Sequence, residues 1–352
     1  MSVTKILWVM ARDAIVCIGG GFMTMMRAIH IEDNAEKSLT WLATNKPSPK
    51  PGEVLIEVAA TAVNRADLVQ RTGNYPPPPG ASSILGLEAS GRIAELGEGV
   101  EGFEVGDRVC VLLTGGGYAE YVTAPASLLM PVPENLSLIE AASLPEVYFT
   151  AWVNLFMEAG AREGDVVLLH AAASGVGTAA IQLCKAFGIE VIATASGSKL
   201  DFLKELGADH VVDRRQQDFV EVVREVTHDR GVDIILDPVG KDYLDRNISA
   251  LATRGRLVNI GLLSGRTAEL NMGRVLVKRL RVIGSVLRSR SVEEKVEIAE
   301  QLRERAWPRF DSGELRPVIH GTMAIERAQQ AHELIASNTT IGKVVLTVND
   351  AQ

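Results

Sequence analysis

A turn of small residues joins an apolar strand pattern to a helix pattern. Residues 166–169 are all Val or Leu, and Ala172, Ser174 and Gly177 then fill the three positions of a G-x-G-x-x-G pattern, with an extra glycine at 175. Small residues let the backbone approach a phosphate, and the last glycine lets the helix lie close to the strand. The helix N-terminus adds unpaired N–H groups and about half a positive charge. A tight turn without a ligand is the alternative. We predict a pyrophosphate site formed by Ala173, Ser174, Gly175, Val176 and Gly177.

The residues after the next strand indicate which dinucleotide would bind. An NAD enzyme holds the ribose with an acidic side chain at this position. Here the chain reads Ser196, Gly197, Ser198 and Lys199, without an acid. Ser196 and Lys199 therefore favour NADPH over NADH, and Arg214 follows the third strand as a second cation for the 2′-phosphate. For both cations the alternative is an ordinary solvated surface side chain.

Further cofactor contacts are expected in loops at the carboxyl ends of later strands, because ligands of open α/β sheets bind along that edge. Arg288, and Arg290 beside it, either bind the pyrophosphate or hold a domain interface. The loop residues predicted to bind cofactor are Val239, Gly240, Gly261, Leu287 and Arg288.

The spacing of apolar runs predicts two kinds of architecture. From residue 26 to about 132, short β patterns separated by glycine turns are typical of an antiparallel barrel or sandwich. One helix interrupts them, with Asn64 as its cap and Asp67 three positions later. After Pro145, strand and helix patterns alternate, which predicts an α/β fold with a doubly wound parallel sheet. The tail from 292 to 348 returns to mixed α/β and is expected to fold back on the first region.

Composition limits the classes of partner. The chain has 352 residues and a formal net charge of −8, which disfavours nucleic acid and anionic membranes. Its three cysteines lie far apart, so we expect a reducing, cytoplasmic location without a disulfide framework. No apolar run reaches the roughly 20 residues that span a bilayer. Residues 1–23 are expected to be a non-native or disordered extension, because a strand pattern begins at Met26.

Several longer segments carry a resemblance. Residues 64–71, 73–78, 84–91, 174–180 and 287–290 resemble the zinc-independent quinone oxidoreductases of the medium-chain dehydrogenase/reductase superfamily, and most resemble their p53-inducible branch. The likeness extends from about residue 26 to 346. It implies a GroES-like β-barrel substrate domain (24–146 and 291–352), a Rossmann NADPH-binding domain (147–290) and a homodimer that joins through the Rossmann sheets.

The resemblance also has consequences for the chemistry. Zinc-dependent members of the superfamily have a histidine where this chain has Leu87, beside Glu88. Leucine cannot bind zinc, and no cysteine lies nearby in sequence. Alcohol oxidation, which needs a Lewis acid, is therefore disfavoured. Hydride transfer from NADPH to a quinone or enone, which needs no metal, is the expected reaction.

The resemblance implies the residues of the acceptor cleft and two further cofactor contacts. Tyr75 would stack on a quinone or hydrogen-bond its carbonyl, or else pack on the neighbouring prolines. Asn64 would donate to the acceptor oxygen or serve only as a helix cap. Thr150 is expected near the nicotinamide, and the proton would come from solvent. Asn338 and Lys343 belong to a family segment that returns to the cofactor, where Lys343 would contact phosphate.

Two departures from the family and two alternative functions remain open. The loop between Thr194 and Leu206 is about one residue shorter than usual, which puts the register of residues 196–198 in doubt, and Arg214 stands where the family more often has tyrosine. A 2-alkenal or enoyl-thioester reductase on the same scaffold is one alternative. The other is a non-catalytic protein that binds NADPH or RNA, although the acidic charge disfavours nucleic acid.

Overall fold

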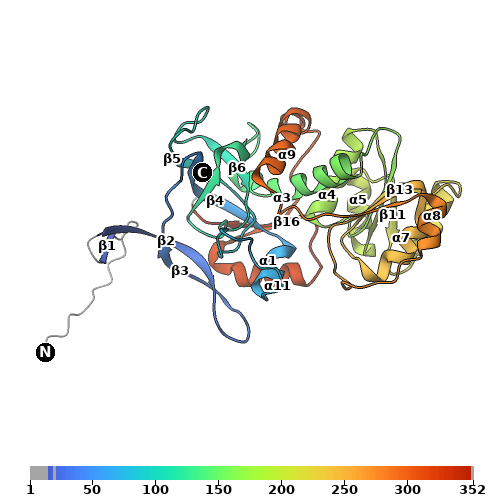
Figure 1. Cartoon of the computed structure of the whole chain (residues 1–352), viewed down its shortest axis with the longest axis horizontal. Coiled ribbons are helices and arrows are strands. Elements are labelled where there is room, and N and C mark those ends of the chain that lie inside the picture. The colour runs from blue at the N-terminus through green and yellow to red at the C-terminus, as the bar shows by residue number, and fades with distance from the viewer. Residues whose placement is uncertain (1–14, 19–20, 350–352) are drawn as a thin grey trace.

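The computed structural model describes residues 15–18 and 21–349. Two large sheets lie in two bodies, with helices packed at their junction (Figure 1). Most of the predicted extension, residues 1–23, lies outside the described residues. Within it, residues 15–18 form strand β1, which pairs with β2 in a three-stranded antiparallel sheet. The strands of this small sheet are β1 (Ile15–Ile18), β2 (Gly21–Ile31) and β3 (Leu39–Asn45).

The second body contains a six-stranded, fully parallel sheet. Its strand order is β11-β10-β9-β12-β13-β14, which is the 3-2-1-4-5-6 order of a doubly wound dinucleotide-binding fold. The predicted α/β class is therefore confirmed. The strands are β9 (Val166–Leu169), β10 (Glu190–Ala195), β11 (His210–Asp213), β12 (Val232–Asp237), β13 (Leu251–Asn259) and β14 (Arg281–Gly284).

Both faces of this sheet are covered, which explains why its central strands are continuously apolar. Along β9, Val167 and Leu169 belong to one buried cluster, and Val166 and Leu168 belong to another on the opposite face. The helices of this body are α4 (Gly175–Ala186), α5 (Leu200–Leu206), α6 (Phe219–Val226), α7 (Leu244–Ala250) and α8 (Met272–Lys278), with short turns η3 (Gly197–Lys199) and η4 (Lys241–Tyr243).

The first body is built on a seven-stranded sheet to which the tail of the chain contributes two strands. β16 pairs with β4, and β15 pairs with β16, so the tail of the chain and β4 share one sheet. The strands are β4 (Glu53–Val63), β5 (Glu88–Leu96), β6 (Arg108–Leu112), β7 (Tyr121–Pro125), β8 (Leu129–Pro131), β15 (Ile319–Ala324) and β16 (Lys343–Thr347).

One helix beside this sheet changes its winding along its length. It begins at Pro145 and continues after Trp152 as the π-helical segment η2 (Val153–Glu158). Proline is favoured in the first turn of a helix because its missing N–H has no partner there in any case. The remaining helices are α1 (Arg65–Arg71), α2 (Leu138–Ala141), α3 (Pro145–Trp152), α9 (Val292–Arg305), α10 (Pro308–Asp311) and α11 (Ala328–Ala336), with short turns η1 (Ala126–Leu128) and η5 (Ile325–Arg327).

Strand β7 begins only at Tyr121. The residues before it pair instead with β2: the carbonyl of Tyr118 accepts from the Ile29 amide, and the Glu120 amide donates to the Arg27 carbonyl. This short stretch therefore connects the small sheet to the large one, which local sequence does not reveal.

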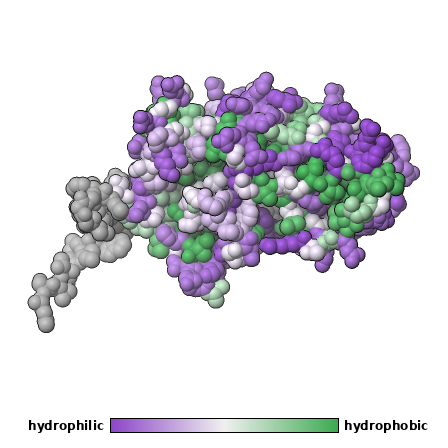
Figure 2. All heavy atoms as spheres, in the orientation of Figure 1, coloured by the Kyte–Doolittle hydropathy of each residue, from purple (hydrophilic) through white to green (hydrophobic). Residues whose placement is uncertain are grey.

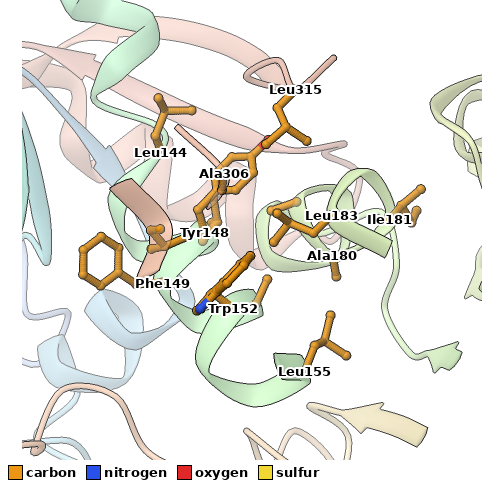
Figure 3. Close-up of a cluster of buried hydrophobic side chains, with 14 of the residues drawn as sticks. Leu144, Tyr148, Phe149, Trp152, Leu155, Ala180, Ile181, Leu183, Ala306 and Leu315 are labelled. Carbon is orange, nitrogen blue, oxygen red and sulfur yellow. The ribbon is translucent and has the colours of Figure 1, made fainter. Parts of the chain in front are cut away.

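The two bodies share an apolar core at their junction. Figure 3 shows Trp152 of α3 among side chains of α4 and the tail, including Leu183 and Ala306. The Trp152 ring stacks on Phe156 with centroids 4.4 Å apart. Its Nε1 donates to Gln301 of α9 over 3.0 Å. This tryptophan therefore connects both bodies through packing and through one hydrogen bond.

We expect Trp152→Ala to destabilise the protein by about 3–5 kcal/mol, because it removes a fully buried aromatic side chain and leaves a cavity. Denaturant unfolding followed by circular dichroism measures the change. Trp41→Ala is the matched control, since Trp41 is only partly buried, and should cost clearly less. Equal losses for the two variants would contradict the role assigned to Trp152.

Candidate functional site

The predicted phosphate turn has the geometry of an anion cradle. The Ser174 hydroxyl accepts from the Gly177 amide over 3.1 Å and caps α4. A Cβ at Gly177 would lie 2.4 Å from the Ala172 carbonyl oxygen, so only glycine fits there. The first amides of α4 are therefore held at an open helix N-terminus, which suits a phosphate group. The five predicted residues, Ala173, Ser174, Gly175, Val176 and Gly177, all lie in this turn or in the first turn of α4.

The tail of the chain lies directly against this turn. The Gly342 amide donates to the Ala173 carbonyl over 2.9 Å. A Cβ at Gly175 would meet the Lys343 and Val147 side chains at 2.6 and 2.9 Å. The turn is thus enclosed by β16 on one side and by the start of α3 on another.

A second part of the site is the loop after β12. The buried carboxylate of Asp237 holds this loop through hydrogen bonds. Asp237 accepts from the amides of Val239 and Gly240 and from the side chains of Asn247 and Asn259. Burial raises the Asp237 pKa, and these donors oppose that rise. The predicted contacts Val239 and Gly240 thus lie in one rigid loop. Gly261 packs against it, because a Cβ there would lie 2.8 Å from the Pro238 carbonyl oxygen.

An open cavity of about 520 Å³ lies at the ends of β10 and β11. Four predicted residues line it: Ser196, Lys199, Arg214 and Asn338. The structure therefore brings them together from two loops and the tail. Sequence reasoning missed other lining residues, which are Gly197, Ser198, Asp213, Arg215, Gln216, Ser337 and Thr339. Asp213 and Arg215 adjoin Arg214 in sequence, and this adjacency is the signal that could have indicated them.

Lys199 is fixed at the wall of this cavity. Its Nζ donates to the carbonyls of Asn338 and Thr340 over 2.8 and 2.7 Å. Burial and then the positive charge of Arg214 lower the Lys199 pKa. An ammonium has three donors, so one N–H remains for a ligand. Asn338 is held from its other side, because its Oδ1 accepts from Arg65 over 2.7 Å.

Arg288 is placed at the domain interface. Its guanidinium donates to the carbonyls of Thr114 and Tyr75 and to the Gln70 side chain, all outside the nucleotide-binding body. It also lies 5.1 Å from the centre of the Tyr75 ring. Of the two alternatives predicted for Arg288, the structure therefore favours interface contact over pyrophosphate binding. Leu287 beside it is buried in the junction core.

Arg290 follows the same pattern. It forms ion pairs with Glu158 and with Glu294, the latter over 3.5 Å, and donates to the Ser285 hydroxyl. These partners engage both terminal nitrogens of the guanidinium, so the interface is favoured here too.

Asn64 and Lys343 meet in a buried polar cluster, although 279 residues separate them. The Lys343 Nζ lies 2.5 Å from Asn64 Oδ1 and 2.7 Å from Glu88 Oε1. Asn64 Nδ2 donates to the same Glu88 oxygen over 2.8 Å. The predicted phosphate contact of Lys343 would have to break this buried ion pair. The predicted donation by Asn64 to an acceptor would compete with its bond to Glu88.

The helix cap predicted for Asn64 is supported through the backbone. The Asp67 carboxylate accepts from the Asn64 amide over 2.7 Å. Asp67 is fully buried, and burial raises its pKa to about 6. Tyr118 Oη lies 3.3 Å from this carboxylate and 3.2 Å from His332 Nε2. A chain of buried polar groups thus extends beneath the cleft.

The other predicted cleft residues, Tyr75 and Thr150, are both half-buried. Burial is the main cause of a raised Tyr75 pKa. Thr150 lies on α3 one turn after Glu146, so the two residues share a helix face. Sequence reasoning did not single out Glu146 or Glu88. Glu88 is the one charged residue of the family-like segment 84–91, which was a signal for it, but no local pattern indicated Glu146.

The position at which zinc-dependent members of the superfamily have a histidine is occupied here by the buried Leu87. Residues 15–18 and 21–349 contain no group of three or more His, Cys, Asp or Glu side chains arranged to hold a metal ion. In the same part of the chain, no helix has the length and apolar character to cross a membrane.

Comparison with known families agrees with this architecture. Residues 50–134 match the alcohol dehydrogenase GroES-like domain, and residues 175–302 match the zinc-binding dehydrogenase family. Among solved structures, the CurK enoyl reductase is 30% identical with a TM-score of 0.82, covering 92% of this chain and 99% of that one. A mycobacterial protein solved in complex with NADPH is also 30% identical, with a TM-score of 0.81 and coverage of 92% and 100%.

Curated relatives are similar over nearly the whole chain. A quinone oxidoreductase of Rattus norvegicus is 32% identical over 329 residues, which cover 92% of this chain and 98% of that protein. The synaptic vesicle membrane protein VAT-1 homolog of the same organism is 34% identical, covering 85% of this chain and 78% of that protein. With its GroES-like and dinucleotide-binding domains, the chain belongs to the quinone oxidoreductase family of the medium-chain dehydrogenase/reductase superfamily.

Proposed function

We propose that this protein is an NADPH-dependent reductase that transfers hydride to a quinone without using a metal ion. The observation that carries the proposal is the cavity of about 520 Å³ at the ends of β10 and β11, with Lys199, Arg214 and Arg215 in its lining. Burial, and secondly repulsion by the neighbouring Arg214 cation, lower the Lys199 pKa. A bound 2′-phosphate would relieve this repulsion and accept charge-assisted hydrogen bonds.

The acidic residue in the cavity does not reverse this preference. Asp213 ends the third strand of the sheet, whereas the acid that holds the ribose in NAD enzymes ends the second. Its carboxylate already accepts from the Arg215 amide over 2.9 Å. The charged side chains that line the cavity are therefore three cations, Lys199, Arg214 and Arg215, and one anion, Asp213.

Bound NADPH would supply the hydride, and the residues of the chain would bind, orient and shield it. The turn at 173–177 fits the pyrophosphate, and Val239, Gly240 and Gly261 border the same sheet edge. Thr150 and Tyr75 would face the nicotinamide and the acceptor, with Arg288 holding the Tyr75 loop in place. The protein's contribution to the rate is then proximity and exclusion of water. Leu87 supports metal-free chemistry, because a quinone accepts hydride without a Lewis acid.

We also propose a homodimer formed through the free edge of the six-stranded sheet. Among the residues that the structure describes, strand β14 pairs with β13 alone, so a second copy can extend the sheet. Figure 2 shows apolar residues gathered at this end of the molecule, around α8. They are Leu262, Leu263, Met272, Leu276, Val277, Val282 and Val286, which are 43–76% exposed. An exposed apolar patch of this kind is typical of an interface.

A cytoplasmic location is part of the same proposal. Cys110 and Cys184 are free, buried thiols, which suits a reducing compartment.

The acceptor is tested by comparing a naphthoquinone with a 2-alkenal and an enoyl thioester under NADPH. We expect the quinone to have the highest kcat/KM. Faster turnover of the alkenal or thioester would favour the enoyl reductase alternative, which the CurK similarity supports. If no acceptor is reduced, a mobility-shift assay with RNA at low salt tests the non-catalytic alternative.

We expect Lys199→Ala to weaken NADPH binding by roughly tenfold or more, because one charge-assisted hydrogen bond contributes about 1.5–3 kcal/mol. NADH affinity should change little, since NADH lacks the 2′-phosphate. Fluorescence titration measures both affinities. Lys204→Ala, which removes an exposed lysine from the next helix, is the control. Equal weakening of NADPH and NADH by Lys199→Ala would contradict the 2′-phosphate assignment.

We expect the double variant Leu276→Glu and Val282→Glu to be monomeric in size-exclusion chromatography with light scattering, while the unmodified chain is dimeric. Placing two carboxylates per copy in an apolar interface costs several kcal/mol. Val105→Glu, at a 63% exposed position outside the patch, should leave the dimer intact. A monomeric unmodified chain, or a dimeric double variant, would exclude this interface.

A further inference from the structure

Glu146 occupies a distinctive place at the junction of the two bodies. It lies in the first turn of α3, directly before Val147, whose side chain packs beside Gly175 of the phosphate turn. Four residues later on the same face is Thr150, the residue predicted to lie near the nicotinamide. Helix α3 therefore places Glu146 next to a residue that packs on the phosphate turn and one helical turn before Thr150.

Charged and titratable groups from every neighbouring element act on Glu146. The Glu88 carboxylate contacts the Glu146 backbone directly, because its Oε2 accepts from the Glu146 amide over 2.9 Å. The groups that interact electrostatically with the Glu146 side chain are Glu88 of β5, Asp67 of α1, Lys343 of β16, Lys295 of α9, and Tyr75 and Arg288 of the two cleft loops.

The lysines and arginine in this group are already engaged by other partners. Lys343 is paired with Glu88, Lys295 donates to the Arg288 carbonyl over 2.8 Å, and Arg288 bonds to Thr114, Tyr75 and Gln70. No hydrogen bond or ion pair to the Glu146 carboxyl group occurs within the described part of the chain. The carboxyl group is thus partly exposed and has no protein partner among these residues.

The protonation state follows from these surroundings. Burial, and secondly the negative charge of Glu88, raise the Glu146 pKa to about 8. Glu146 is therefore mostly protonated at neutral pH and can donate a proton. The two other carboxyl groups of the cluster, Glu88 and Asp67, are fully buried. Glu146 alone among the three is partly exposed, so it can meet an acceptor and be reprotonated by water.

We propose that Glu146 is the proton donor that completes reduction of the acceptor. This inference rests on the proposed function. Hydride carries two electrons to the quinone and leaves a hydroquinone monoanion, with oxidised nicotinamide as the second product. The Glu146 O–H bond then breaks, and its proton forms the O–H bond of the anionic oxygen. The resulting carboxylate takes up a proton from water through the open side of the cleft. This replaces the solvent proton expected from the sequence.

The experiment compares the unmodified protein, Glu146→Gln and the control Glu300→Gln, with NADPH and a naphthoquinone from pH 6 to 9. Gln has nearly the shape of a protonated Glu but cannot give up a proton, and Glu300 is exposed on the outer side of α9. General acids contribute about 10²–10⁴-fold. We expect Glu146→Gln to lower kcat at least about tenfold at neutral pH, and Glu300→Gln to change it less than about twofold.

The pH profile and two further measurements separate catalysis from a structural role. A general acid acts when protonated, so kcat/KM of the unmodified protein should fall as pH rises through about 8, and Glu146→Gln should lose that fall. NADPH affinity should stay within about twofold. An infrared band of a protonated carboxyl group should be present at neutral pH and absent in Glu146→Gln, whatever the turnover.

Stability gives an independent check on the same titration. A carboxyl group whose folded pKa is raised contributes full stability below its unfolded pKa, and that stability is lost as pH rises to the folded value. The melting temperature of the unmodified protein should therefore decline relative to Glu146→Gln as the pH rises from 4.5 to about 8, and level off above that.

Each outcome has a distinct meaning. If the unmodified protein reduces the quinone and Glu146→Gln keeps its rate and pH profile, the proton-donor assignment is overturned and the proposed function stands. Absence of the infrared band also overturns it, without reference to activity. If the unmodified protein reduces no acceptor, the proposed function itself fails, and the proton-donor role fails with it.

Discussion

The ion pair between Lys343 and Glu88 is the interaction on which the site most depends. Both side chains are at least 95% buried, and removing one partner of such a pair costs about 3–5 kcal/mol because it leaves a buried charge. The pair joins β16 of the tail to β5, and Asn64 at the start of α1 completes it. Glu88 also receives the first amide of α3 through Glu146. Four segments distant in sequence, β16, β5, α1 and α3, therefore meet at one charge pair.

This arrangement links the acceptor side to the cofactor side. The backbone of β16 meets the phosphate turn through Gly342 and Ala173, while the Lys343 ammonium stays with Glu88. The tail then continues to Asn338 and Thr340, whose carbonyls hold Lys199. One returning segment thus contacts Glu88, the turn at 173–177 and Lys199. Binding of a dinucleotide along this segment would contact both bodies at once.

The polar groups of the cleft also divide into two kinds. Glu88 and Asp67 have donors on their oxygens and are sealed from solvent, which suits support. Glu146 has neither a donor nor complete burial, so its charge state responds to pH. The same contrast separates Arg288, whose guanidinium is held by the interface, from Arg214, which is exposed in the cavity. A polar side chain whose atoms are already hydrogen-bonded stabilises the fold, whereas one with free polar atoms can bind a ligand. The type of residue does not decide between the two.

The sequence by itself determined the doubly wound sheet, the phosphate turn and the cluster of Ser196, Lys199 and Arg214, because these features depend on periodicity and on residues adjacent to strand ends. Only the tertiary structure decided the partners of Asn64, Lys343 and Arg288. From the sequence alone, each of these polar side chains could have several roles. Its role depends on which distant group forms its hydrogen bonds or ion pair when it is buried. Glu146 is the clearest case: nothing in its local sequence distinguishes it from an ordinary first-turn glutamate, and its protonation state arises from desolvation and a carboxylate 58 residues away.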